Sequence, residues 1–422
     1  MNRAWSGIAL VAFGVTCHAP PVSAQVNQRL AQQYFQEAQV LCERDGGRLW
    51  GVSICAPMVV FDRGTQTIAT SHPQPAGSLP PPLGFVNAPI KWGDTTWAAF
   101  VWDYFTDRPP RRRKELFLHE MFHGVQGRLG VAAPFLASEH LDAAEGRYWL
   151  RLEWRALDRA LRTTGDERRL AVRDALAFRQ ARRLLYPAGA EPERAQEITE
   201  GLAAYTATVL VADSPSDAIA SARDLLVVTG DPGESFVRTF AYLSGPAYGV
   251  LLDASSPGWT RRVRSADDLG ILLATALQVE PVADASDAAI HYAGPEVRAS
   301  EARREELQHE RLAELRRRFV DGPVLLIRGG GSASSDSRGA VVIEGAGTIY
   351  FGSYRATVAA GSLEAETGVL VTSDGGSRRV PAPVLRDAVT VAGDGWTFRV
   401  APGWVVRTGA RQGDYVVIER EP

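Results

Sequence analysis

The stretch His119-Glu120-Met121-Phe122-His123 places two histidines four positions apart and a glutamate directly after the first. On an α-helix, residues four apart lie one above the other, so both imidazoles can bind one metal ion. The glutamate then lies beside the ion, as on the metal-binding helix of zinc hydrolases. The alternative is two hydrogen-bonded histidines and a solvated glutamate. Because the chain has only seven histidines, the pattern stands out, and we take it as the centre of the fold.

The first residues resemble an export signal. Arg3 supplies a positive charge, Ile8–Val15 an apolar stretch, and Val22-Ser23-Ala24 a small-residue cleavage site. This apolar stretch is too short to span a bilayer, and no later segment approaches the roughly 20 apolar residues that spanning requires. The sequence therefore predicts a signal peptide at residues 1–24 and a secreted or periplasmic protein without a transmembrane segment.

The cysteines are Cys17, Cys42 and Cys55. Cys17 falls inside the expected signal, which leaves an acylated lipoprotein as an alternative to simple export. Cys42 and Cys55 would remain as a pair in an oxidising compartment, where a disulfide is expected. Two buried thiols are the alternative.

The formal net charge is -3, which gives no reason to expect a nucleic-acid partner. The one concentrated run of positive charge, Arg111-Arg112-Arg113-Lys114, is expected to form the solvated start of the metal-binding helix. The sequence assigns this run no role.

Strand-like segments precede the histidine helix. They are Leu49–Ile54, Met58–Phe61, Thr67–Thr70 and Thr96–Trp102. Trp97, Phe100 and Trp102 lie on the last of these, and we expect them to pack in the core. An edge strand at this position that pairs with an extended peptide is the alternative.

Helical periodicity then dominates the chain as far as Ala276, and the histidine helix itself is expected to begin near Pro109-Pro110 and to end at Gly127 or Gly130. From Pro323 onward, short apolar runs between glycine-rich turns predict an antiparallel β domain. The other expected helices are Asn27–Glu43, Ala143–Arg162, Glu167–Leu185, a helix from Pro192 to about Val211, most of Ser235–Ala276, and Arg298–Phe319.

A catalytic zinc site has three protein ligands and one open position, so a residue downstream must complete the histidine pair. The segment Ile198-Thr199-Glu200-Gly201-Leu202-Ala203-Ala204-Tyr205 resembles the Glu-Gly-Leu-Ala-x-Tyr motif of the peptidase MA-like, gluzincin metallopeptidases. In that family the glutamate binds zinc, which implies His119, His123 and Glu200 as the ligands. Alternatives for the third ligand are Glu153, Glu197, His140 and Asp142.

The resemblance covers roughly Thr96–Ala276 and includes Tyr248-Gly249, and it departs from the family in a long helical hairpin, about Ala143–Leu185, between the two motifs. It implies an α+β zincin-like catalytic domain, in which a small antiparallel sheet is followed by the active-site helix and a helical subdomain. We expect this domain at residues 25–320 and a β-sandwich-like accessory domain at residues 321–422.

The function expected from these motifs is that of a secreted zinc-dependent metallopeptidase acting on peptides or proteins. Bound Zn²⁺ would activate a water molecule, and Glu120 would act as general base and acid. Two other functions stay open: a cell-envelope binding or scaffold protein without turnover, and a metal-dependent amidase acting on cell-wall peptide. An oxyanion donor could come from Tyr205, Tyr242, Tyr248 or His140, and the sequence does not choose among them.

Overall fold

The computed structural model describes residues 25–62, 65–75, 87–105, 108–227, 235–282, 284–335, 339–387 and 389–420. The expected signal peptide, with Cys17, lies outside these residues. The chain divides into two compact units, and the division falls between Glu301 and Ala302, inside helix α11 (Gly294–Arg316). The boundary that we expected after residue 320 lies beyond the end of this helix, and it stays a prediction.

The first unit begins with a helix and a small sheet. Strands β1 (Met58–Phe61), β2 (Ile68–Thr70), β3 (Ala88–Trp92) and β4 (Thr95–Val101) form a sheet in the order β2-β1-β4-β3. The pairs β1–β2 and β3–β4 are antiparallel, but β1 and β4 run parallel. The sheet is therefore mixed, and the expectation of a purely antiparallel sheet was wrong.

The strand predicted at Leu49–Ile54 was also wrong, because this segment forms turns. The Asp45 carboxylate accepts hydrogen bonds from the backbone N–H groups of Gly47 and Leu49, each at 3.1 Å. Gly47 and Gly51 have φ angles of 84° and 79°, which glycine tolerates far better than other residues. Capping and glycine conformation thus override the apolar pattern here.

Most of the other predicted helices of this unit form close to their expected positions. The helix predicted from Pro192 to Val211 is divided by a π-helical turn at Glu197–Gly201. The helices are α1 (Gln28–Asp45), α2 (Pro110–Leu129), α3 (Ala144–Arg162), α4 (Gly165–Leu185), α5 (Ala190–Gln196), α6 (Leu202–Val211), α7 (Pro215–Val227), α8 (Phe240–Ser255), α9 (Leu269–Leu277) and α10 (Ala285–Ala289).

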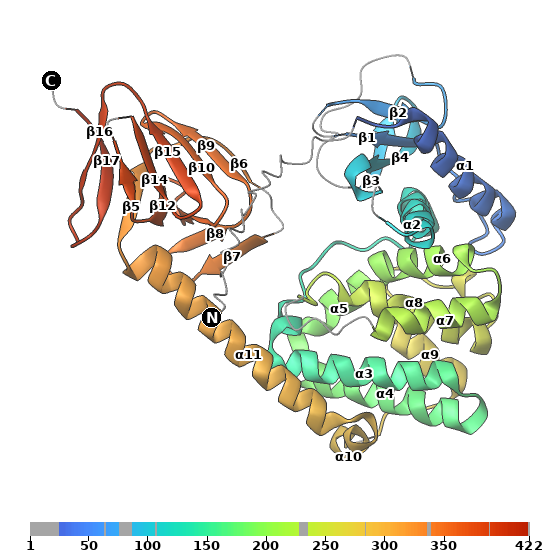
Figure 1. Ribbon diagram of the computed structural model, residues 1–422. Helices are drawn as coiled ribbons and strands as arrows, with labels where there is room; N and C mark the ends of the chain where they lie inside the picture. The colour runs from blue at the N-terminus through green and yellow to red at the C-terminus, as the bar shows by residue number, and fades with distance from the viewer. Residues whose placement is uncertain are drawn as a thin grey trace, which may run out of the picture. The chain divides into compact units, whose positions relative to one another are not determined.

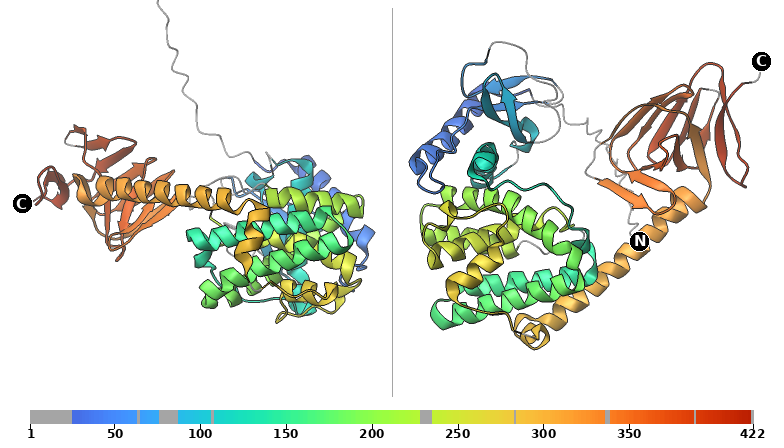
Figure 2. Two further views of the ribbon diagram at one scale, coloured as in Figure 1. Left: turned by 90° about the horizontal axis from the view of Figure 1, so that it is seen from below. Right: turned by 180° about the vertical axis from the view of Figure 1, so that it is seen from behind.

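Helix α2 lies between the sheet and the remaining helices. Its Phe117, Leu118, Met121 and Phe122 are fully buried, and they join a continuous apolar core that includes Phe100 of β4. Figure 1 shows the sheet above α2, with α6 and then α8 beyond it, and the view from behind in Figure 2 shows the same order. The helix that carries both histidines is therefore enclosed by core on two sides.

Helix α2 has well-defined ends. Pro110 occupies its first turn, where the missing N–H group costs nothing. Gly130 ends it with a φ angle of 69°, and its N–H donates to the carbonyl groups of Gln126 and Gly127. These residues fix the register of the helix and hence the face on which His119 and His123 lie.

A disulfide joins Cys42, on α1, to Cys55, in the segment before β1. The predicted pairing is therefore confirmed. Closing a loop of this separation contributes roughly 3 kcal/mol to stability in the chain-entropy model. None of the helices formed by the described residues is long and apolar enough to cross a membrane.

The second unit is a β-sandwich of two sheets, a seven-stranded sheet ordered β16-β17-β5-β12-β11-β8-β7 and a six-stranded sheet ordered β13-β14-β15-β10-β9-β6. Leu325 and Val417 from the first sheet and Leu363 and Phe398 from the second are buried in one core. The strands are β5 (Val324–Arg328), β6 (Gly331–Ser335), β7 (Ala340–Ile343), β8 (Gly347–Tyr350), β9 (Tyr354–Val358), β10 (Gly361–Ala365), β11 (Val369–Thr372), β12 (Ser377–Pro381), β13 (Leu385–Arg386), β14 (Thr390–Gly393), β15 (Trp396–Val400), β16 (Trp404–Thr408) and β17 (Tyr415–Glu419).

The predicted β character of the C-terminal region is thus confirmed. One detail differs, because β17 pairs parallel with β5, whereas the remaining pairs among the described strands of this second unit are antiparallel. In the first unit, Trp97, Phe100 and Trp102 are buried as expected, and β4 is an interior strand. The edge of that sheet near α2 is β3.

Candidate metal centre

His119 and His123 lie in the middle of α2 and face the same point. Their Nε2 atoms are 2.9 Å apart, and their ring planes meet at 82°. His119 is 7 % exposed, so its imidazole is shielded from water. Two imidazole nitrogens this close need a proton or a cation between them, because their lone pairs would otherwise repel.

Glu200 approaches this pair from the π-helical turn Glu197–Gly201. Its Oε2 atom lies 3.2 Å from His119 Nε2 and 3.4 Å from His123 Nε2. Among the described residues, these three make up the group of histidine, cysteine and acidic side chains whose ligand atoms lie within 4.8 Å of one another. The structure therefore brings together the three ligands expected from the sequence.

The atoms His119 Nε2, His123 Nε2 and Glu200 Oε2 form a triangle, the ligand triangle, whose size fits an ion with tetrahedral coordination. Ligands about 2.0–2.1 Å from zinc lie roughly 3.3 Å from one another. The three edges here, 2.9, 3.2 and 3.4 Å, bracket that separation. The donor set of two imidazoles and one carboxylate is also one that zinc accepts at catalytic sites.

The electrostatics of the triangle leave the carboxylate ionised. Burial favours the neutral form of Glu200, but hydrogen bonds from His119 and His123 hold its pKa well below the usual range. Burial lowers the pKa of His119, which favours the neutral imidazole. For His123 burial acts in the same direction, but its bond to Glu200 raises the pKa above the usual value.

Gln126 orients His123, a role that was not predicted from the sequence. Its Nε2 donates to the Thr199 carbonyl oxygen at 2.8 Å, so its Oε1 faces His123 Nδ1 at 2.6 Å. In the neutral ring this contact places the proton on Nδ1, which makes the Nε2 lone pair available to a metal ion. The signal was available, since Gln126 follows His123 by three positions on one helix face.

Glu120 is 7 % exposed and does not join the ligand triangle. Burial raises its pKa to about 7, and the charges of His123 and Glu200 make smaller contributions. A carboxyl group that titrates near neutral pH can both accept and return a proton. This behaviour suits a general base and acid.

Tyr242, on α8, covers the outer side of His119. The two rings stack with centroids 5.2 Å apart and planes inclined by 15°. Burial and the nearby Glu200 carboxylate raise the pKa of Tyr242, so its hydroxyl keeps its proton and remains a hydrogen-bond donor. Of the four residues considered as oxyanion donors, this is the one that lies beside the histidines.

The other three are held elsewhere. Tyr205 donates to Asp253 at 2.7 Å, and Tyr248 donates to Glu153 at the same distance. His140 Nε2 lies 2.7 Å from Oε1 of Glu193, on α5.

The alternative third ligands also have partners away from the histidines. Glu153 accepts from Arg182 Nη1 at 2.7 Å, and Glu197 accepts from Arg179 Nη1 at 2.7 Å. Asp142 accepts from Ser235 Oγ at 2.7 Å. The insertion Ala143–Leu185 thus supplies buried arginines that pair with these carboxylates and does not supply a group to the triangle.

Close helix contacts position the turn that carries Glu200. A side chain at Gly245 of α8 would meet the Cα of Gly201 at 2.3 Å, and one at Gly249 would meet the ring of Tyr205 at 2.1 Å. Any larger residue at Gly245 or Gly249 would prevent α8 from approaching the Gly201 backbone and the Tyr205 ring this closely.

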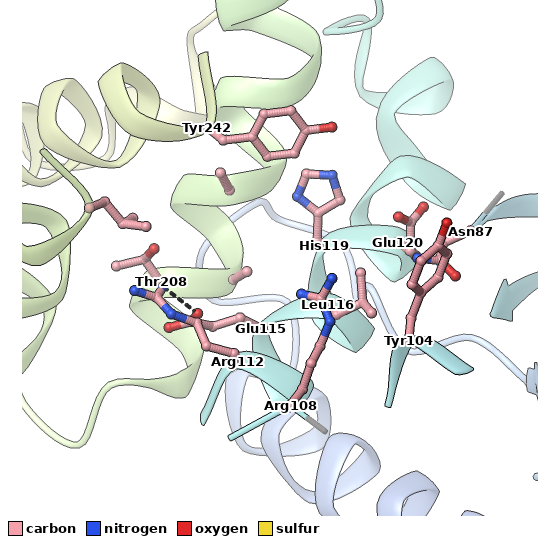
Figure 3. A pocket seen from close by; sticks show the side chains of 13 residues that line it. Asn87, Tyr104, Arg108, Arg112, Glu115, Leu116, His119, Glu120, Thr208 and Tyr242 are labelled. Atoms are coloured by element: carbon pink, nitrogen blue, oxygen red, sulfur yellow. Dashed lines mark hydrogen bonds and ion pairs between the residues drawn. The ribbon is translucent and has the colours of Figure 1, made fainter. Parts of the chain in front are cut away.

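His119 and Glu120 line an open cleft of about 550 Å³ (Figure 3). In this view His119 lies between Tyr242 on one side and Arg108 on the other. A second hollow, of about 710 Å³, reaches His123 from the side of β3. A substrate thus has access to the histidine pair from the surface.

Comparisons of the chain with protein-family models, with curated proteins and with solved structures found no match. The assignment of function therefore depends on the motifs and on the geometry of this site.

Proposed function

We propose that the protein is a secreted zinc-dependent metallopeptidase of gluzincin type that hydrolyses peptide bonds. The observation that carries this proposal is the ligand triangle of His119, His123 and Glu200 with the buried Glu120 beside it in an open cleft. A purely structural metal site would have no need for a carboxyl group that titrates near neutral pH next to its ligands.

His119, His123 and Glu200 would hold the zinc ion. When bound, zinc supplies Lewis acidity: it lowers the pKa of a water molecule toward about 7 and polarises a carbonyl group. Gln126 keeps His123 in the tautomer whose Nε2 is free to bind.

Glu120 moves the proton. Its carboxylate accepts a proton from the water that attacks the scissile carbonyl carbon, and then returns this proton to the amide nitrogen as the C–N bond breaks. The Tyr242 hydroxyl donates a hydrogen bond to the oxygen on which negative charge develops. Because its pKa is raised, this hydroxyl stays protonated throughout.

The edge strand β3 offers a way to hold an extended peptide. It pairs with β4 on one side, and the hollow along it is continuous with the surface around His123. A substrate strand that pairs with β3 would have its backbone aligned with α2. Main-chain hydrogen bonds of this kind bind peptides with little dependence on sequence.

Export forms part of the proposal. The disulfide between Cys42 and Cys55 fits an oxidising compartment, as the signal-like residues 1–24 predict.

The test is to measure bound zinc and the hydrolysis of a mixed peptide library for the mature protein. We expect one zinc per chain and cleavage of peptide bonds. Glu120→Gln should retain the zinc and lose activity by at least about 1000-fold, because the proton acceptor is removed. Glu43→Gln, which alters an exposed glutamate on α1, is the matched control and should remain active.

Two outcomes would count against the proposal. A zinc-loaded wild type that cleaves no peptide would favour the scaffold function, and cleavage restricted to cell-wall peptides would favour the amidase. A Glu200→Ala protein with full zinc occupancy would remove Glu200 as a ligand.

A further inference from the structure

Two arginines share the cleft with His119 and Glu120. Arg108 precedes α2, and Arg112 lies in its first turn. In Figure 3 both side chains lie on the side of the cleft opposite Tyr242. The sequence pattern indicated no role for the run Arg111–Lys114, whereas the structure places Arg112 in the lining of the cleft.

All three arginines of the run Arg111–Lys114 have carboxylate partners. Arg111 and Arg112 contact the two oxygens of Glu115 at 3.2 and 2.8 Å. Arg111 also forms a bidentate pair with Asp217, at 3.0 and 3.1 Å. These two cations are therefore neutralised by two nearby anions.

Arg113 is neutralised in the same way but points away from the cleft. Its Nη2 lies 3.4 Å from Glu37, and its guanidinium covers the ring of Tyr34 at 3.7 Å. Arg108 differs from all three, because its exposed side chain has no hydrogen-bond or ion-pair partner among the described residues. Of the two arginines that line the described part of the cleft, it is the one that no described carboxylate neutralises.

The start of α2 favours an anion beside Arg108. The first turn of the helix has no acidic residue and no side-chain cap, so the positive end of its macrodipole is not compensated there. An anion at this position would face a guanidinium that no carboxylate of the described residues neutralises. A carboxylate suits this position, because a guanidinium can donate two parallel hydrogen bonds to its oxygens.

We infer that Arg108 forms a subsite for a carboxylate of the peptide substrate close to the scissile bond. This inference rests on the proposed peptidase function and names its substrate class: peptides with an acidic side chain or a free C-terminal carboxylate near the cleavage site. Arg108 is the residue that determines this specificity, and it does not take part in bond cleavage.

The first experiment compares matched peptides that differ only in charge. One pair carries glutamate or glutamine at each position near the cleaved bond, and a second pair ends in a free acid or an amide. The wild type should prefer one charged member by about tenfold or more in kcat/KM, which is the scale of a charged hydrogen bond. The first pair reports a side-chain carboxylate and the second a terminal one.

Arg108→Gln should abolish this preference and change kcat/KM for the neutral peptides less than about twofold. Arg29→Gln, which removes an exposed arginine from α1 in the same unit, is the matched control and should keep the preference. Equal cleavage of charged and neutral peptides by the wild type, or an unchanged preference in Arg108→Gln, would overturn the inference.

A binding measurement separates this inference from the proposed function. The matched charged and neutral peptides are labelled with a fluorophore, and their affinity for the Glu120→Gln protein is measured by fluorescence anisotropy. The same measurement is made on the double variant that also carries Arg108→Gln. Tighter binding of the charged member, lost in the double variant, supports the subsite even if no peptide is hydrolysed. Equal affinities in both proteins contradict it, whatever the catalytic result.

Discussion

Glu197 and Glu200 lie three positions apart on one π-helical turn, yet they belong to different kinds of region. Glu197 faces a buried ion network in which Arg179 also contacts Glu153 and Asp268, at 3.2 and 3.1 Å. Glu200 faces His119 and His123, whose Nε2 atoms lie 3.2 and 3.4 Å from its Oε2 atom. In the network, arginines neutralise the buried carboxylates. In contrast, His119, His123 and Glu200 bring three electron-pair donors together. The difference separates a structural cluster from a site suited to a ligand.

The largest effect is expected from removing a cation of the network. Arg182 is fully buried and contacts both Glu153 and Glu193 at 2.7 Å. Arg182→Met removes one of the two arginines that contact each of these buried carboxylates, which should lower the free energy of unfolding by about 3–5 kcal/mol. Urea denaturation measures this loss.

The control for that change is Arg162→Met. Arg162 is more than half exposed and pairs with Asp158 at 2.8 Å on the helix surface. Its removal should cost less than about 1 kcal/mol. Similar losses in the two variants would mean that the network contributes no more than a surface pair.

The two glutamates themselves provide the next test. Glu200→Gln should weaken zinc binding by at least about 100-fold, because a ligand is lost and outer partners already account for 10–100-fold. Its unfolding free energy without metal should change little. Glu197→Gln should show the reverse pattern, with zinc affinity retained and stability lowered by about 2–3 kcal/mol.

Titration with a chromophoric chelator and urea denaturation give the two quantities. If both variants lost zinc affinity to the same degree, Glu197 and Glu200 would not have the separate structural and metal-binding roles inferred for them.

A smaller effect is expected at Gln126, which links the regions. Gln126→Leu removes the partner of His123 Nδ1 and should weaken zinc binding by about 10–100-fold. Gln126→Glu keeps an acceptor for that N–H and should recover most of the affinity, although its bond to Thr199 is lost. If the leucine variant bound zinc as tightly as the wild type, the orienting role would be ruled out.

The smallest expected effect is a loss of folding stability at acidic pH. Burial opposes ionisation of Glu193 and Asp268, but Arg182 for the first and Arg179 for the second hold their pKa values below the usual range. Their contribution to stability is present above the ordinary carboxyl pKa of about 4 and is lost as pH falls through the lowered values. Glu197 acts in the opposite direction, because burial raises its pKa.

We therefore expect the free energy of unfolding to decline below about pH 4, by about 1.4 kcal/mol for each unit of lowered pKa. Asp268→Asn can retain the N-cap bond to the Ile271 N–H while it removes the charge. Its pH profile should be flatter, and an identical profile would exclude Asp268 as a contributor.

Local patterns predicted much of the fold because their causes are local. The span of α2 follows from Pro110 and Gly130, and the C-terminal sandwich from apolar runs between glycine-rich turns. The strand predicted at Leu49–Ile54 does not form, because the hydrogen bonds of Asp45 and the backbone conformation of two glycines outweigh the apolar pattern. The parallel pairing of β1 with β4 was not predicted, because the order and direction of strands in a sheet depend on contacts distant in sequence.

The sequence by itself determined that His119 and His123 share one helix face, since helical periodicity is a property of adjacent turns. Only the tertiary structure decided that Glu200 joins them while Glu153 and Glu197 pair with arginines. It also decided that Tyr242 lies beside His119 and that Arg108, in the cleft, has no side-chain partner among the described residues. The reason is physical: the fate of a buried charge depends on which opposite charges the packing brings within a few ångströms, and short-range sequence patterns do not encode that.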